Sequence, residues 1–168
     1  MIAPETSSAP PSFQPDGRLG PRLERIHRQW LRELRARMEQ PKAKDRNIWA
    51  RWEVIRYLDT EFSHRFDQER SAIGRIAEGP VLWVAGELVS NLLWQLRNNV
   101  GLCHHGAEFS SLSGKLVRAV EYWFTTVEDV VGPTRWGDLS PEARAELASV
   151  GIDLPSRNEP PVPVATGS

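Results

Sequence analysis

Residues 80–106 read PVLWVAGELVSNLLWQLRNNVGLCHHG, a long apolar run that ends in polar residues. The pair Gly79-Pro80 interrupts the chain before this run, and proline suits the first position of a helix. At 100° per residue, the aliphatic side chains cover one wide arc of a helix. They are Val81, Ala85, Leu88, Val89, Leu92, Leu93 and Leu96. The sequence therefore predicts a helix over 81–98 that is the most buried element of the chain, followed by a loop.

The opposite arc of this predicted helix mixes polar side chains with two large aromatics, Trp83 and Trp94. The polar residues are Glu87, Ser90, Asn91, Arg97 and Asn98. Trp and Arg are enriched where protein interfaces are fully desolvated. We therefore expect this arc to pack against a second subunit, with packing against another helix of the same chain as the alternative.

Two helices are predicted before this one. The first covers 21–40 and ends ahead of Pro41. Its apolar stripe consists of Leu23, Ile26, Trp30, Leu34 and Met38. The second covers 45–76, and Asp45 or Asn47 can cap it. Its expected core face consists of Trp52, Ile55, Phe62 and Phe66, with Trp49 and Leu58 nearby.

Two more helices are predicted after the loop. One covers 110–131 and stops at Gly132-Pro133. Its core face consists of Leu116, Val120, Trp123, Phe124 and Val127. The other is short, begins with the cap and first-turn residues Ser140-Pro141-Glu142, and ends near residue 150.

No segment alternates between apolar and polar residues with a period of two, so no sheet is expected. The predicted fold is all-α, with four main helices in an up-down bundle and a short fifth helix. This bundle forms one domain over residues 20–152. The proline-rich segments 1–19 and 153–168 cannot bury enough apolar surface to order themselves, and we expect both to be disordered.

The composition of the 168 residues bounds the class of protein. A net charge of −1 gives no global sign of nucleic-acid binding, so any basic surface must be local. A single cysteine excludes an intrachain disulfide, and the N-terminus lacks the pattern of a signal peptide. Segment 80–96 is interrupted by polar residues and is barely the ~20 residues needed to span a bilayer. We expect a cytoplasmic protein that does not enter the membrane.

Four arginines share the outward side of the first predicted helix: Arg25, Arg28, Arg32 and Arg35. Such a row usually forms a solvated charged face, and the glutamates in the same helix favour that interpretation. The alternative is a row of guanidinium groups that contacts the phosphates of a nucleic acid.

Two patterns raise the question of a metal site. Glu61 and His64 stand three residues apart, as in half of a di-iron carboxylate site, but the chain has no second such pair. Cys103, His104 and His105 are adjacent, yet adjacent residues rarely converge on one ion, and a structural zinc needs four ligands. We therefore expect no metal and no other cofactor, an exposed ion pair of Glu61 and His64, and a buried or idle thiol at Cys103.

The most distinctive chemistry lies in the segment 97–106. Arg97 and Asn98 end the apolar helix, and six residues separate Arg97 from His104, which is followed by His105 and Gly106. An arginine can hold a phosphate with a two-pronged set of donors, and a histidine can exchange protons near neutral pH. Arginine and histidine brought together where a helix meets a loop therefore suggest phosphate chemistry.

This arrangement resembles the HEPN superfamily, the "higher eukaryotes and prokaryotes nucleotide-binding" domains. The family is marked by an arginine, usually a polar residue next, four to six intervening residues in all, and then a histidine. It is a bundle of four or five helices with this motif at a helix end. Gly101 within the spacer and the second histidine depart from the pattern and leave open whether His104 or His105 acts.

The resemblance implies a metal-independent endoribonuclease of a toxin or defence type. Arg97 and His104 would be its catalytic pair, and RNA would supply the nucleophile through its 2′-hydroxyl group. Two subunits of the family usually share a cleft, which would fit an interface at Trp83 and Trp94. The residues that would support the catalytic pair are Asn98, Glu87, Asn91 and His105. A protein antitoxin or regulator is a further expected partner.

A different class of function is also compatible with the sequence. The same aromatic side of the predicted helix 81–98 could bind a protein partner, which would make the chain a non-catalytic helical adaptor. An enzyme needs Arg97 and His104 to face one cleft, whereas an adaptor does not.

Overall fold

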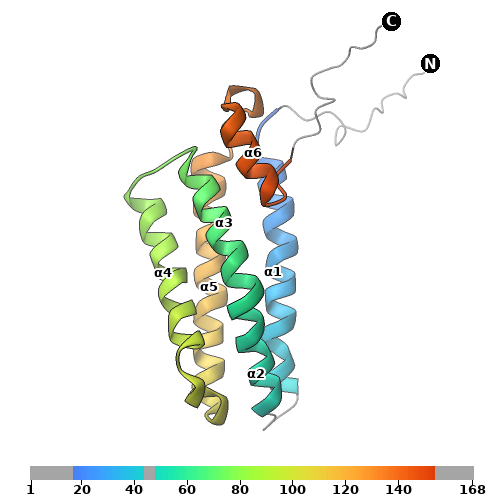
Figure 1. Cartoon of the computed structure of the whole chain (residues 1–168), viewed down its shortest axis with the longest axis vertical. Coiled ribbons are helices and arrows are strands. Elements are labelled where there is room, and N and C mark those ends of the chain that lie inside the picture. Colours follow the sequence, from blue (N-terminus) through green and yellow to red (C-terminus); the bar gives the residue numbers. More distant parts are fainter. Residues whose placement is uncertain (1–16, 44–47, 154–168) are drawn as a thin grey trace, which may run out of the picture.

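A computed structural model of the chain describes residues 17–43 and 48–153 (Figure 1). Within these residues the helices are α1 (Gly20–Ala43), α2 (Ile48–Tyr57), α3 (Ser63–Gly74), α4 (Pro80–Arg97), α5 (Gly106–Val131) and α6 (Pro141–Ser149). A π-helix, Leu58–Phe62, joins α2 to α3, and two 3-10 helices occupy Val100–His104 and Trp136–Asp138. The described residues contain no β-strand, only an isolated bridge between Arg18 and Arg135. The prediction of an all-α protein is confirmed.

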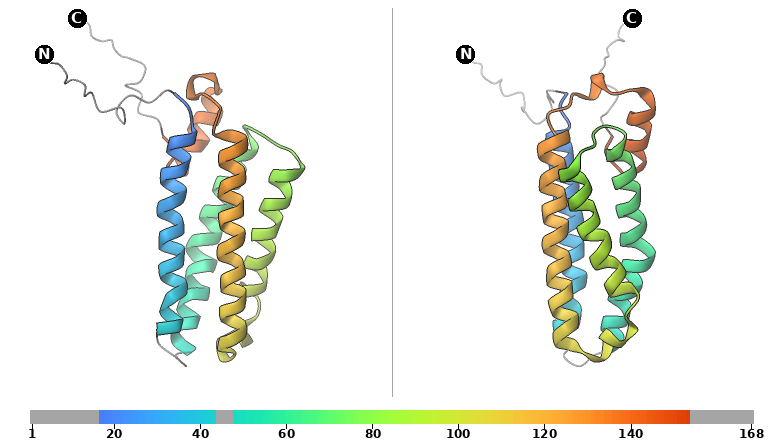
Figure 2. Two further views of the ribbon diagram at one scale, coloured as in Figure 1. Left: turned by 180° about the vertical axis from the view of Figure 1, so that it is seen from behind. Right: turned by 90° about the vertical axis from the view of Figure 1, so that its left-hand side faces the viewer.

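The long helical segments lie side by side along the length of the molecule (Figures 1 and 2). α5 packs against both α1 and α4, and α2 packs against α1. α2, the π-helix and α3 follow one another without a break and form one long helical segment of this arrangement. The short helix α6 packs against α3 at one end of the molecule, and the loop after α4 lies at the other end (Figure 1).

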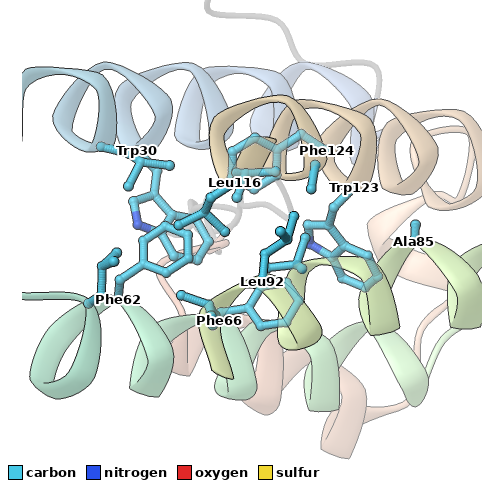
Figure 3. Packing of buried hydrophobic residues seen from close by; sticks show 14 of the residues in the cluster. Trp30, Phe62, Phe66, Ala85, Leu92, Leu116, Trp123 and Phe124 are labelled. Carbon is cyan, nitrogen blue, oxygen red and sulfur yellow. The ribbon is translucent and has the colours of Figure 1, made fainter. Parts of the chain in front are cut away.

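Aromatic side chains fill the centre between α1, α3 and α5 (Figure 3). The ring centroid of Trp30 lies 4.9 Å from that of Phe62 and 5.4 Å from that of Phe124, and Phe66 meets Trp123 edge to face at 5.4 Å. Such pairs contribute about 0.5–1.5 kcal/mol each beyond the area they bury. The aromatic cluster therefore joins α1, the π-helix, α3 and α5.

The helix ends predicted from local signals are nearly correct except in α1, in the helix predicted over 45–76, and in α5, which begins at Gly106 instead of residue 110. α1 continues through Pro41 to Ala43 instead of ending at residue 40, and Pro41 is buried in the last turn. The single helix predicted over 45–76 is interrupted by the π-helix, whose terminal residues Leu58 and Phe62 are both buried. The expected caps Asp45 and Asn47 lie outside the described residues, as do segments 1–16 and 154–168 of the predicted disordered ends.

The predicted core face of α2 was wrong in part. Trp49 is 77% exposed and Trp52 is 42% exposed, although both were expected in or near the core. Ile55 is buried as predicted, and Arg51 and Val54 take the other inward positions. Because successive helical residues are turned by about 100°, an inward Arg51 leaves Trp52 at the rim of the bundle.

The predicted burial of the apolar helix was also too high. α4 buries Leu82, Ala85, Val89, Leu93 and Leu96, but Val81 and Leu88 are exposed. α4 stands at the edge of the bundle, and α5 is its main neighbour (Figure 2). A helix with neighbours on one side buries only that arc, whatever the apolar content of the rest.

None of the helices within the described residues is long and apolar enough to cross a membrane.

Candidate functional site

Arg97 lies in the last turn of α4, where a positive side chain suits the C-terminal end of the helix dipole. Its Nε and Nη2 atoms each lie 2.7 Å from Oδ1 of Asp59, a residue of the π-helix. Both side chains are exposed. Surface pairs of this kind contribute about 0–1 kcal/mol, so Asp59 holds the guanidinium group in place without removing it from solvent.

Asn98 follows Arg97 and ends the helix. Its Nδ2 atom donates a hydrogen bond of 3.0 Å to the carbonyl oxygen of Trp94. The side chains of Trp94, Arg97 and Asn98 are all exposed at this end of α4. Asn98, the predicted polar neighbour of Arg97, thus uses its side chain to cap the end of α4.

The two histidines follow at the end of the 3-10 helix Val100–His104. His104 and His105 are both exposed, and His105 donates its backbone N–H to the carbonyl oxygen of Leu102 at 3.0 Å. Within the described residues, no hydrogen bond or ion pair joins Arg97 to His104 or His105. The structure therefore places these side chains on one short segment, all open to solvent, without direct contact between them.

Cys103 points the other way and is buried. Burial raises the pKa of the Cys103 thiol, and the nearby charge of Arg51 offsets part of that rise. A buried neutral thiol beside exposed histidines is not positioned to share an ion with them. Within residues 17–43 and 48–153, no group of three or more His, Cys, Asp or Glu side chains is arranged to hold a metal ion.

Arg51 anchors this segment to the rest of the molecule, and sequence reasoning missed it. Its side chain is only 8% exposed, and its Nε atom donates a hydrogen bond of 2.7 Å to the carbonyl oxygen of Cys103. A signal was present, because Arg51 precedes Ile55 and Leu58 at the four- and three-residue steps of a buried stripe. An arginine on such a stripe needs an internal partner, and the loop carbonyl provides it.

The other predicted supporting residues lie away from Arg97. Glu87 accepts a hydrogen bond of 3.0 Å from Nη2 of Arg70 on α3. Residues 87 and 97 are separated by about 15 Å along a helix that rises 1.5 Å per residue. Asn91 is exposed on α4. The structure brings neither Glu87 nor Asn91 to the arginine.

The four arginines of α1 are all exposed. Two of them are engaged with carboxylates, since Arg28 pairs with Glu24 and Arg35 pairs with Glu121. Arg25 and Arg32 share the same outward side. The row is therefore a mixed charged surface over α1 and α5.

Large apolar side chains lie on the outward face of α4. Trp83 is 62% exposed and Trp94 is 63% exposed. Three aliphatic residues of the same helix are also exposed, namely Val81, Val84 and Leu88. Exposed apolar patches on a folded domain often mark interaction sites. We call these five residues the outward face of α4.

A cavity of about 350 Å³ opens between the end of α3, the start of α4 and α5. Its lining includes Trp83, Leu82, Ile73 and Trp123. Arg70 stands at its edge, but its guanidinium group already contacts Glu87, the Ser90 hydroxyl at 3.1 Å and the Trp83 carbonyl at 3.4 Å. The lining of the cavity is thus mainly apolar, and its charged residues are Arg70 and Glu78.

A second polar cluster lies in the core and was not predicted. Nε2 of His27 lies 2.8 Å from Oε2 of Glu69, its Nδ1 lies 2.9 Å from Oε2 of Glu128, and its ring stacks on Phe124 at 3.9 Å. Trp123 donates its indole N–H to Glu69 at 3.0 Å. Burial lowers the pKa of His27, but the two carboxylates outweigh burial and raise it to about 9. The cluster links α1, α3 and α5 through a buried charged histidine.

The pair considered for half of a di-iron site is separate from this cluster. Glu61 lies in the π-helix and His64 in the first turn of α3, and both side chains are exposed.

No family model, no curated protein and no solved structure matches this chain.

Proposed function

We propose that the protein is a metal-independent endoribonuclease of the HEPN type and acts as a homodimer. The observation that supports this function best is the placement of Arg97 and His104. Arg97 is exposed at the end of α4, and His104 is exposed at the end of the following 3-10 helix, which Arg51 ties to the core. We infer the type of reaction from the resemblance of the segment 97–106 to the HEPN superfamily.

The reaction needs little besides these two side chains. A base removes the proton of the RNA 2′-hydroxyl group, and the 2′-oxygen attacks the adjacent phosphorus. The bond from phosphorus to the 5′-oxygen then breaks, and that oxygen takes up a proton. The products are a 2′,3′-cyclic phosphate and a 5′-hydroxyl end. Histidine can exchange both protons, and arginine can stabilise the charge that develops on the phosphate oxygens.

The ion pair with Asp59 is compatible with this role. A phosphate group presents two oxygens to the guanidinium group and forms stronger, charge-assisted hydrogen bonds. It has to displace only an exposed carboxylate, whose pairing contributes about 0–1 kcal/mol. Asp59 would therefore keep Arg97 oriented until RNA arrives.

The outward face of α4 supports the homodimer. Trp94 is exposed one helical turn before Arg97, so a second subunit that covers Trp94 would approach the arginine as well. Two motifs would then border one cleft. The expected dimer interface is centred on Trp83 and Trp94.

The direct test is cleavage of single-stranded RNA by the purified full chain in the presence of EDTA. DNA should resist, because it has no 2′-hydroxyl group. His104→Ala should reduce the rate by about 10²- to 10⁴-fold, the usual contribution of a general acid or base. Arg97→Ala should lose a comparable amount, because the charge on phosphorus would be left unpaired.

His105→Ala is the matched control, since it is a neighbouring exposed histidine outside the permitted spacing. It should keep most of the activity, and circular dichroism should show that all three variants are folded. Cleavage that requires a divalent metal, or that persists in the Arg97→Ala, His104→Ala double variant, would exclude the nuclease.

A non-catalytic adaptor is the second candidate, and the exposed apolar residues of α4 favour it. Trp83, Val84 and Leu88 present an apolar surface to solvent whether or not Arg97 and His104 act. A protein antitoxin or regulator could cover the same face in either case. The adaptor would be favoured if the wild-type protein binds a protein partner without cutting RNA, and if the Trp83→Glu variant no longer binds that partner.

A further inference from the structure

A smaller cavity, of about 270 Å³, opens between α1 and α5. None of its lining residues belongs to the segment 97–106 or to the outward face of α4. The apolar part of its lining includes Met38 of α1 and Val117 of α5. Ligand cavities usually measure about 300–1,000 Å³, so this one suits a small molecule.

Ser113 of α5 lines this cavity and has a buried hydroxyl group without a partner. The residue is only 2% exposed, and its Oγ atom forms no hydrogen bond within the described residues. A buried hydroxyl group that lacks a hydrogen bond destabilises the folded chain, and nearly all buried polar groups in proteins have a partner. A ligand in the cavity would supply the partner that Ser113 lacks.

The next residue in the lining, Gly114, also costs stability. It lies in the interior of α5, a helix of 26 residues, where only proline is less favourable than glycine. Packing does not require it, because a Cβ atom added to Gly114 would only make an ordinary contact of 3.5 Å with Nη1 of Arg118. The glycine does keep this part of the wall free of a side chain. Two neighbouring residues thus depart from what stability favours, as is expected at a functional site.

Arg118 gives the cavity a positive charge without a counter-ion. Its side chain is exposed and forms no hydrogen bond or ion pair within residues 17–43 and 48–153. The other arginine of the lining, Arg35, is already paired with Glu121. A ligand with one negative charge would therefore match Arg118, whereas Glu121 and Glu39, which also line the cavity, would repel a second negative charge.

We propose that this cavity binds a small organic monoanion, namely a carboxylate with a short apolar chain. The carboxylate oxygens accept hydrogen bonds from the guanidinium group of Arg118 and from the hydroxyl group of Ser113, and charge-assisted bonds of the first kind are strong. The apolar chain lies against Met38 and Val117. The site shares no residue with the pair Arg97 and His104, so it does not depend on the proposed nuclease.

The test is a titration of the ¹⁵N-labelled full chain with butyrate, followed through backbone amide shifts. The amides of Ser113 and Gly114 should shift and saturate with a Kd of about 1 mM, an ordinary affinity for a ligand of this size. 1-Butanol offers the apolar chain without the charge, and inorganic phosphate offers charge without the chain. Both should bind at least about tenfold more weakly than butyrate, which is a loss of about 1.4 kcal/mol.

Arg118→Gln should weaken butyrate binding by about tenfold or more, because the charge-assisted hydrogen bonds are lost. The side chain is exposed, so the variant should fold as the wild type does. The matched control is Arg32→Gln, which removes an exposed arginine of α1 that does not line the cavity. Arg32→Gln should bind butyrate with unchanged affinity.

Ser113→Ala and Gly114→Ala should each change affinity and stability in opposite directions. Ser113→Ala removes the hydroxyl group that binds the ligand and should weaken butyrate binding several-fold. Without ligand it should raise the urea midpoint of unfolding, because no buried hydroxyl group is left without a partner. Gly114→Ala adds a methyl group to the wall of the cavity and favours the helix, so it should also bind more weakly and unfold at higher urea.

The site is excluded if the amides of Ser113 and Gly114 show no saturable shift, or if the shifts persist unchanged in both Arg118→Gln and Ser113→Ala. It is also excluded if Arg32→Gln weakens binding as much as Arg118→Gln does, because the effect would then be one of general surface charge. Equal affinities for butyrate and 1-butanol, or tighter binding of phosphate, would contradict a carboxylate ligand. RNA cleavage by the same protein has no bearing on these outcomes, so this site and the nuclease stand or fall separately.

Discussion

Two charged pairs in this molecule have opposite surroundings. His27 and Glu69 meet between α1 and α3 in the core, where Glu128 also pairs with His27 and the indole N–H of Trp123 donates to Glu69. Arg97 and Asp59 meet at the end of α4, where both side chains are exposed.

The difference shows which region can change partners. Removing one member of the buried pair leaves the other as a buried charge that has lost a partner, and this is strongly destabilising. The exposed pair can exchange one anion for another at little cost, because water screens both states. The core cluster is therefore suited to fixing α1, α3 and α5, whereas the end of α4 is free to meet a ligand.

The largest expected effect comes from breaking the core cluster. Glu69→Ala should lower the free energy of unfolding by about 3–5 kcal/mol, because it leaves His27 charged and buried with one partner fewer. Urea denaturation followed by circular dichroism measures this change. Glu61→Ala, an exposed glutamate in the neighbouring π-helix, is the control and should change stability by no more than about 0.5 kcal/mol. Equal losses in the two variants would contradict the role given to the cluster.

A somewhat smaller effect is expected from pH. The pKa of His27 is raised to about 9, above the value of about 6.5 for an unfolded histidine. Its contribution to stability is therefore complete below about pH 6.5 and is lost as the pH rises toward 9. Between about pH 6 and about pH 8.5 the loss amounts to about 2 kcal/mol.

Unfolding experiments at these two pH values measure the loss directly. The groups that face His27 are Glu69 from α3 and Glu128 from α5. His27→Gln should be less stable at the lower pH and should lose most of the pH dependence. His64→Gln, which replaces an exposed histidine, should retain it. A wild-type protein whose stability rises over this range would show that His27 is not charged in the folded state.

The smallest effect on stability is expected at the outward face of α4. Replacing both Trp83 and Trp94 with glutamate should leave the helical content unchanged and alter the free energy of unfolding of the monomer by about 0.5 kcal/mol or less. Association should be lost, so light scattering should report a single chain where the wild type reports two. Trp49→Glu, at an exposed tryptophan outside α4, should leave the dimer intact. A wild type that is already monomeric at high micromolar concentration would show that this face does not join two copies.

Local sequence signals predicted most of the helix boundaries. Gly79 precedes α4, Pro80 is its first residue and Arg97 its last. Ser140 caps α6 by accepting a hydrogen bond of 3.1 Å from the backbone N–H of Ala143. These features depend on residues within a few positions of one another. Apolar periodicity and capping chemistry are local properties, so they can be read without knowledge of the fold.

Which side chains face inward, and which residues contact each other, depends on how the helices pack. Arg51 and His27 are buried while Trp52 and Leu88 are exposed, although hydrophobicity alone predicts the reverse. Asp59 reaches Arg97 from a different helical segment. Burial depends on how many neighbours a helix has, and ion pairs depend on how helices are placed beside one another. Neither is a property of a short stretch of sequence, because both arise when distant segments pack.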